Sequence, residues 1–175
     1  MPYLTRKITR AKWESGDELG ADEIPADAVT ADLRTTGNTL SFWKIENPSD
    51  EEIRITALAL ATGAERIDRL DLAWVEEDGF QDDGLSLNPN DGRTPVVSLR
   101  KNHVDVTKLD LDRLCKVAVS VSQAISRGQH QRFTKKELIN IIVEAVGKGL
   151  LSLSDLAPNV REEIEKELGN LPTQA

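Results

Sequence analysis

The residues with the widest catalytic repertoire in this sequence are its two histidines, His103 and His130. A pair of histidines can act as the acid and the base of a metal-free nuclease. These two flank a segment, from about 108 to 127, whose apolar spacing predicts one long helix. About 20 residues at 1.5 Å rise separate the ends of that helix by roughly 30 Å. Two such histidines could share a site only across a dimer interface, so each is expected to be an ordinary loop residue.

A nucleophile in an activating environment is also missing. The sequence has no GxSxG motif, which would place a serine on a sharp strand-to-helix turn. Its single cysteine, Cys115, follows Leu114 in the predicted helix, with Asp110 and Asp112 close before it. Burial and neighbouring acids both raise the pKa of a thiol and leave it unreactive. We therefore expect Cys115 to be a small core residue, and we predict no catalytic residue.

Metal ligands are poorly supplied. One cysteine and two distant histidines match no zinc spacing, and there is no HExxH motif. Carboxylates in the acidic loop at 77–92 could hold magnesium or calcium, but neither Gly84 nor Gly92 fits the sixth position of an EF-hand loop with proper ligands before it. We expect a solvated acidic loop and no cofactor, and leave open whether this loop binds a cation.

The segment SFWKIENPSDEEI, residues 41–53, reads as a strand followed directly by a helix. Such junctions bind phosphate when glycines and free amides face the anion. Here Pro48 removes an amide, Ser49 and Glu52 form a capping box, and three consecutive carboxylates would repel an anion. The junction is therefore expected to be structural, and no GxGxxG or P-loop motif occurs elsewhere.

Composition indicates one soluble, cytosolic protein. The 175 residues carry a net charge of −8 with 39% hydrophobic residues, which suits a chain with its own core and disfavours a surface built wholesale for nucleic acid or lipid. No run approaches the roughly 18 apolar residues of a membrane span. One cysteine excludes an intramolecular disulfide framework.

The first half of the chain predicts a small sheet. Four segments have strand patterns, at about 3–9, 39–46, 68–76 and 96–100. A short helix is expected at about 25–34, and a longer one at 49–62. Residues 53–61 also alternate as a strand would, but the cap, the alanines and the length favour helix. Strand 39–46, helix 49–62 and strand 68–76 together predict a right-handed βαβ unit with parallel strands.

The second half predicts three helices. The first, about 108–127, has Thr107 as its expected cap and an apolar stripe formed by Leu111, Leu114, Ala118, Val121 and Ile125. The second opens with a capping box at Thr134 and Glu137, and the third runs from Pro158 to Leu168. The expected fold is α+β, with a mixed part at 1–100 packed against a helical part at 101–175 in one continuous domain.

The most arguable functional feature is SRGQHQRFTKK, residues 126–136, which we call the basic island. Its candidate contact residues for an anion or a partner are Arg127, His130, Arg132, Lys135 and Lys136. A helix–turn–helix reader would insert the helix at 134 into the major groove, but glutamates on that helix and the acidic chain oppose phosphate. An acidic protein surface, including the 14–32 segment of another copy, fits at least as well.

We expect a non-catalytic protein–protein interaction module, such as a bacterial accessory or regulatory subunit or a small acidic inhibitor or immunity protein. Trp13 is a candidate interface residue, although closing the core is the simpler role for it. A homodimer through the helical half is expected, with no membrane association. The alternatives are a nucleic-acid-binding accessory protein that uses the basic island, and an unrecognised hydrolase or nuclease that uses carboxylates.

Overall fold

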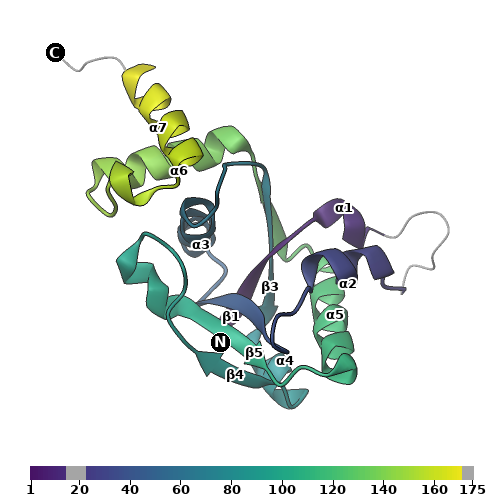
Figure 1. The fold of residues 1–175 in the computed structure, drawn as a ribbon. Helices are drawn as coiled ribbons and strands as arrows, with labels where there is room; N and C mark the ends of the chain where they lie inside the picture. Colours follow the sequence, from purple (N-terminus) through teal and green to yellow (C-terminus); the bar gives the residue numbers. More distant parts are fainter. Residues whose placement is uncertain (15–22, 171–175) are drawn as a thin grey trace.

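The computed structural model describes residues 1–14 and 23–170, which form a mixed α+β fold around one six-stranded antiparallel sheet (Figure 1). The strand order is β4-β5-β2-β1-β3-β6. The strands are β1 (Tyr3–Ile8), β2 (Leu40–Ile45), β3 (Leu70–Glu76), β4 (Ser86–Pro89), β5 (His103–Thr107) and β6 (His130–Phe133). The α+β class expected from the sequence is therefore confirmed.

The first strand lies at the centre of the sheet. β1 pairs antiparallel with β2, with Tyr3 opposite Ile45, and antiparallel with β3, with Leu4 opposite Val75. β2 and β3 consequently run parallel to each other, as the sequence predicted, but β1 separates them. The predicted βαβ unit is thus a split one, because β1 pairs with segments far along the chain.

One face of the sheet is covered by four helices: α1 (Arg10–Trp13), α2 (Ala26–Asp32), α4 (Glu77–Asp82) and α5 (Leu111–Ser126). We call it the α5 face. Its core joins Leu4, Phe42 and Phe80 to the inner side of α5, and the two phenylalanine rings meet edge to face with centroids 5.4 Å apart. Aromatic and aliphatic side chains from distant segments therefore share this core.

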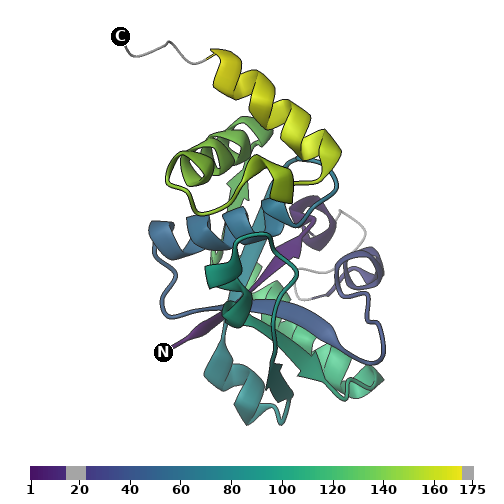
Figure 2. The ribbon, with the colours of Figure 1, turned by 60° about the vertical axis from the view of Figure 1, so that its left-hand side comes forward.

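The other face, which we call the α6 face, is covered by α3 (Asp50–Thr62), α6 (Lys135–Gly147) and α7 (Pro158–Asn170). α6 packs against both α3 and α7 (Figure 2). Its core is mainly aliphatic, with Ile53, Leu138, Ile142 and Ile164 almost fully buried. The helix expected over 53–61 is therefore correct, and the strand alternative is not.

Two short 3₁₀ turns complete the chain, η1 (Val97–Asn102) and η2 (Leu153–Asp155). The strand predicted at 96–100 is wrong, because η1 occupies that segment and the strand β5 follows it. The grouping of three C-terminal helices is wrong too, since α5 lies on one face of the sheet while α6 and α7 lie on the other. The strand β6 connects the two faces.

The buried side of α5 differs from the predicted stripe. Leu111 is 77% exposed, and Val117 and Ala124 are buried in addition to the expected alanine and valine. Cys115 is exposed, so its assignment to the core is wrong. The N-cap is Asp110, whose side chain accepts from the backbone of Arg113 at 2.8 Å, and Thr107 ends β5 instead.

Among the residues that the structure describes, no helix has the length and apolar character needed to cross a membrane.

Candidate functional site

The basic island surrounds one edge of the sheet. Arg127 is the exposed C-cap residue of α5, His130 and Arg132 lie on β6, and Lys135 and Lys136 begin α6. β6 is the last strand of the sheet and pairs only with β3 among the described strands. The island therefore follows the chain across the sheet edge from the α5 face to the α6 face.

Two of the five candidate residues form ion pairs within the chain. The Arg132 guanidinium donates from Nε to Asp71 Oδ1 at 2.6 Å and from Nη2 to Asp71 Oδ2 at 3.3 Å. The hydrogen bond to Asp71 raises the pKa of Arg132 above its ordinary value, and the Asp71 carboxylate is buried. Lys135 Nζ lies 2.7 Å from Glu163 Oε1. These two cations help to hold the fold.

The other three, Arg127, His130 and Lys136, have no ion-pair partner within the described residues. Arg127 precedes β6 by a turn at Gly128, whose φ of 74° suits glycine. Lys136 follows β6 in the first turn of α6 and is exposed. Unpaired positive charge thus lies at both ends of this short strand.

Two residues of β6, His130 and Arg132, have backbone N–H and C=O groups that are not used in pairing with β3. Trp74 donates its backbone N–H to the Gln129 carbonyl at 3.1 Å, and Leu72 is opposite Gln131 in the register. Antiparallel partners alternate between bonded and non-bonded pairs, so the N–H and C=O groups of His130 and Arg132 point away from β3. In the described part of the chain these groups have no backbone partner.

The helix–turn–helix arrangement is not present. α5 and α6 lie on opposite faces of the sheet and are joined through β6, instead of packing directly against each other across a short turn. The helix α6 therefore has no first helix positioned to hold it in a major groove. The nucleic-acid alternative would have to use the island's charges in another geometry.

Trp13 lies in the core. Its side chain is 5% exposed, packs in the α5-face cluster and donates from Nε1 to Asp32 Oδ2 at 2.8 Å. This placement agrees with the core role and does not support Trp13 as a contact residue for a partner.

The two histidines are far apart, as their positions around α5 predicted. His103 lies on β5 and His130 on β6, with three strands between them. Four steps at ~4.8 Å separate such strands by about 19 Å. His103 is a strand residue, so the expectation that it lies in a loop is wrong, and the same holds for His130.

A polar cluster around His103 escaped the sequence reasoning. His103 Nδ1 lies 2.5 Å from Asn90 Oδ1, and Asn90 Nδ2 donates to Asp105 Oδ2 at 2.6 Å. Ser41 Oγ donates to Asp105 Oδ1 at 2.9 Å. The sequence signal for this cluster was the alternation of polar residues along β2 and β5. That pattern cannot predict that Ser41 lies opposite Asp105 until the register of the two strands is known.

This cluster contains the residue types of a hydrolase but not their connectivity. A serine nucleophile needs its hydroxyl within hydrogen-bond reach of the base, whereas the Ser41 hydroxyl donates to the Asp105 carboxylate. Burial lowers the pKa of His103, and the nearby Asp105 opposes that shift. The arrangement therefore fastens the segment around Asn90 to the sheet.

The predicted acidic loop at 77–92 is largely ordered into α4 and β4. Its Glu77 is buried and its Oε2 lies 2.7 Å from Lys44 Nζ. Over residues 1–14 and 23–170, no group of three or more histidine, cysteine or acidic side chains is placed to hold a metal ion.

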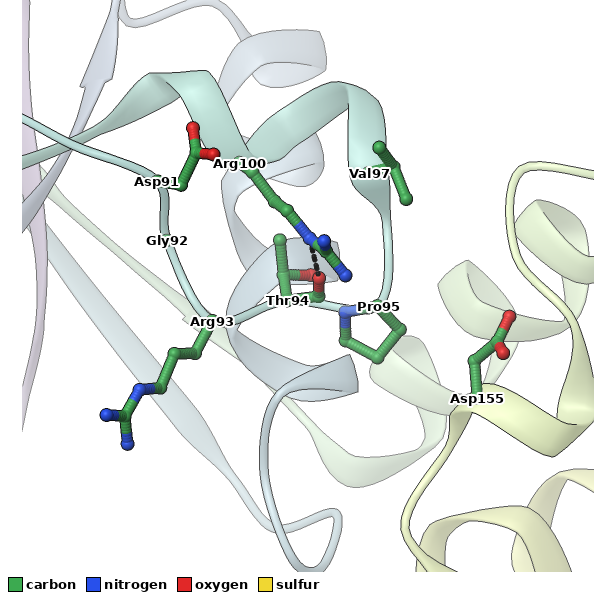
Figure 3. A pocket seen from close by; sticks show the side chains of 8 residues that line it. All are labelled: Asp91, Gly92, Arg93, Thr94, Pro95, Val97, Arg100 and Asp155. Atoms are coloured by element: carbon green, nitrogen blue, oxygen red, sulfur yellow. Dashed lines mark hydrogen bonds between the residues drawn. The ribbon is translucent and has the colours of Figure 1, made fainter.

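An open hollow of about 580 Å³ lies between two parts of the chain (Figure 3). Residues from 91 to 100, which include the start of η1, line one side, and Asp155 of η2 lines the other. Arg100 donates from Nε to the Thr94 carbonyl at 2.9 Å, and the Arg93 side chain points away from Arg100. Asp155, on η2, faces the hollow from the far side, and its Oδ2 accepts from the Ser152 backbone. Its charged groups do not converge on one point, so the hollow has no evident catalytic arrangement.

Comparisons with protein-family models, with curated proteins and with solved structures give no match for this chain.

Proposed function

We propose that this protein is a non-catalytic interaction module that binds an acidic segment of a protein partner at the basic island. The observation that carries the proposal is the placement of Arg127, His130 and Lys136, which have no ion-pair partner in the described chain and surround an edge strand. The other two candidate residues, Arg132 and Lys135, are already paired with Asp71 and Glu163.

Electrostatics supports a protein partner with local negative charge. The chain carries a net charge of −8, so long-range attraction to nucleic acid is weak while a basic patch still offers a local contact for carboxylates. Exposed charges of this kind set the association rate and its salt dependence more than the final affinity. Binding through the island is therefore expected to weaken as salt rises.

The test is a charge reversal with a matched control. A fluorescein-labelled decapeptide of alternating glutamate and valine is titrated with the protein and its anisotropy is followed at two salt concentrations. The double variant Arg127→Glu with Lys136→Glu is expected to bind about tenfold more weakly, a loss of about 1.4 kcal/mol. The control Lys101→Glu with Lys108→Glu makes the same change in net charge at exposed positions on either side of β5, which three strands separate from β6, and is expected to change affinity by less than about twofold.

Equal losses in the two double variants would contradict the proposal, as would no binding of the peptide to the wild type. Tighter binding of a DNA duplex than of the peptide, lost on charge reversal in the basic island, would favour the nucleic-acid alternative instead.

Two further expectations accompany the proposal, a cytosolic location and a homodimer through the helical half. Light scattering tests the second.

A further inference from the structure

We propose that the acidic segment binds as an added strand along the outer edge of β6, so that the six-stranded sheet gains a seventh strand. This inference rests on the proposed function and names the way in which the partner is held. An extended peptide that joins a sheet edge gains affinity from backbone hydrogen bonds and specificity from alternate side chains.

β6 can accept a strand without loosening its existing pairing. Gln131 and Phe133 are opposite Leu72 and Leu70, and their backbone groups face β3. His130 and Arg132 alternate with these two residues, so their backbone N–H and C=O groups point away from β3 at the open edge. An added strand would therefore bind groups that the fold itself does not use.

The opposite edge of the sheet is less suited to this role. Its strand β4 has the sequence SLNP, contains no basic residue and ends at Pro89, which has no N–H to donate. Asp105, on the neighbouring β5, adds negative charge beside it. An acidic segment would be repelled from that edge and attracted to β6.

The charges also decide between an acidic partner and a second copy of β6. Pairing two β6 strands about a two-fold axis would bring two basic islands together, and like charges opposite each other on neighbouring strands destabilise the pair. A strand with carboxylates at alternate positions instead meets His130 along the strand and Arg127 and Lys136 at its ends. The structure therefore favours an extended acidic segment of another protein.

The decisive experiment is a matched pair of variants at one position. His130→Pro removes the outward N–H, and the amides that bond to β3 belong to other residues, so the ladder is kept. His130→Ala removes the side chain and keeps that N–H. With the glutamate–valine decapeptide, His130→Ala is expected to bind more weakly than wild type through the lost side chain, and His130→Pro about tenfold more weakly than His130→Ala, because only the proline variant also loses the outward N–H. Far-UV circular dichroism and thermal melting check that both variants fold.

Amide hydrogen exchange gives a second measurement on the unaltered protein. Saturation with the peptide is expected to slow exchange at His130 and Arg132, while Gln131 and Phe133 are protected with or without it. This readout keeps the inference testable if His130→Pro fails to fold. A merely electrostatic contact would leave the exchange of the two outward amides unchanged.

The outcomes separate this inference from the proposed function. If reversal of Arg127 and Lys136 weakens binding but His130→Pro binds like His130→Ala, with no new amide protection, strand addition is overturned and the interaction module stands. If the peptide binds neither wild type nor variants, both are overturned. Concentration-dependent self-association that His130→Pro abolishes would make a second copy the occupant and would overturn the choice of an acidic partner.

Discussion

The two faces of the sheet are stabilised by different kinds of contact. On the α5 face, the Arg6 guanidinium donates to the Asp32 carbonyl at 2.9 and 2.5 Å and to the Ser41 carbonyl at 2.5 Å. On the α6 face, the cap at Thr134 and Glu137 and the cap at Ser152 are closed within a few residues of chain. The α6 face also has ion pairs between distant segments, Arg54 with Glu144 at 2.6 Å and Lys135 with Glu163 at 2.7 Å, but these are exposed. The long-range polar contacts of Arg6 and Asp32 on the α5 face are partly buried, so the two faces differ in how far such contacts are shielded from water.

The long-range contacts of the α5 face include a partly buried charge. Burial lowers the pKa of Arg6 to about 10, and the neighbouring Asp32 opposes that shift. At neutral pH the guanidinium stays protonated, and it lies over the Phe42 ring at 5.5 Å from its centroid. The comparison teaches that disruption of a single polar residue should affect the α5 face more than the α6 face.

The largest expected effect is at Asp32. Its carboxylate accepts from the Thr9 backbone at 2.6 Å, from the Thr9 hydroxyl at 2.9 Å and from Trp13 Nε1 at 2.8 Å. Asp32→Ala would leave these donors without an acceptor and is expected to lower the free energy of unfolding by about 2–4 kcal/mol. Urea denaturation measures the change.

The control for that experiment lies on the same helix. Asp27 is exposed in the first turn of α2, and Asp27→Ala is expected to cost less than about 1 kcal/mol, mainly through the helix dipole. Equal costs at the two positions would show that the polar contacts around Asp32 do not hold the α5 face together.

A smaller effect is expected on the α6 face. Thr134→Ala removes the side chain that accepts from the Glu137 backbone at 3.3 Å, and with it the hydroxyl bonded to the Glu137 carboxylate. The expected loss in unfolding free energy is about 1 kcal/mol. Ser126→Ala, at the exposed end of α5, serves as the control with a change within about 0.5 kcal/mol. A loss at Thr134 as large as that at Asp32 would remove the distinction between the faces.

The smallest effect concerns pH and His103. Its pKa is lowered in the folded protein, chiefly by burial, so the folded state binds fewer protons there than the unfolded state. The stability that neutral His103 contributes is fully present above its unfolded pKa of about 6.5. It is lost as the pH falls from there through the lowered pKa of His103 in the folded protein. Between pH 7.5 and 5.5, wild type is therefore expected to lose more unfolding free energy than His103→Gln. Parallel pH profiles would contradict this.

Sequence reasoning succeeded where the signals were local. The N-caps at Ser49 and Thr134 and the starts of α3, α6 and α7 follow from a few neighbouring residues. One detail differs at the first cap. The Ser49 hydroxyl accepts from the Glu52 backbone N–H, as expected. The Ser49 backbone N–H, however, donates to Asn47 Oδ1 at 3.1 Å and not to the Glu52 side chain of the predicted capping box.

Sequence reasoning failed where pairing between distant segments decides whether a segment becomes a strand or a side chain is buried. β5 and β6 have five and four residues, too few for a strong pattern of their own, and each becomes a strand because β2 or β3 offers an open edge. On α5, the apolar residues extend around two adjoining sides of the helix, and only the neighbouring elements determine that Val117 is buried and Leu111 is exposed. The candidate site at β6 was located by its charge, but its strand geometry depends on the same distant pairing.

The central position of β1 has a consequence for how the protein acquires its structure. Residues 3–8 are synthesised before both of their neighbours, β2 and β3, which end at residues 45 and 76. The sheet cannot assemble until both have left the ribosome, and contacts of such long sequence separation slow folding. Until then β1 has two unsatisfied edges, so this segment is where a nascent chain would most need protection from aggregation.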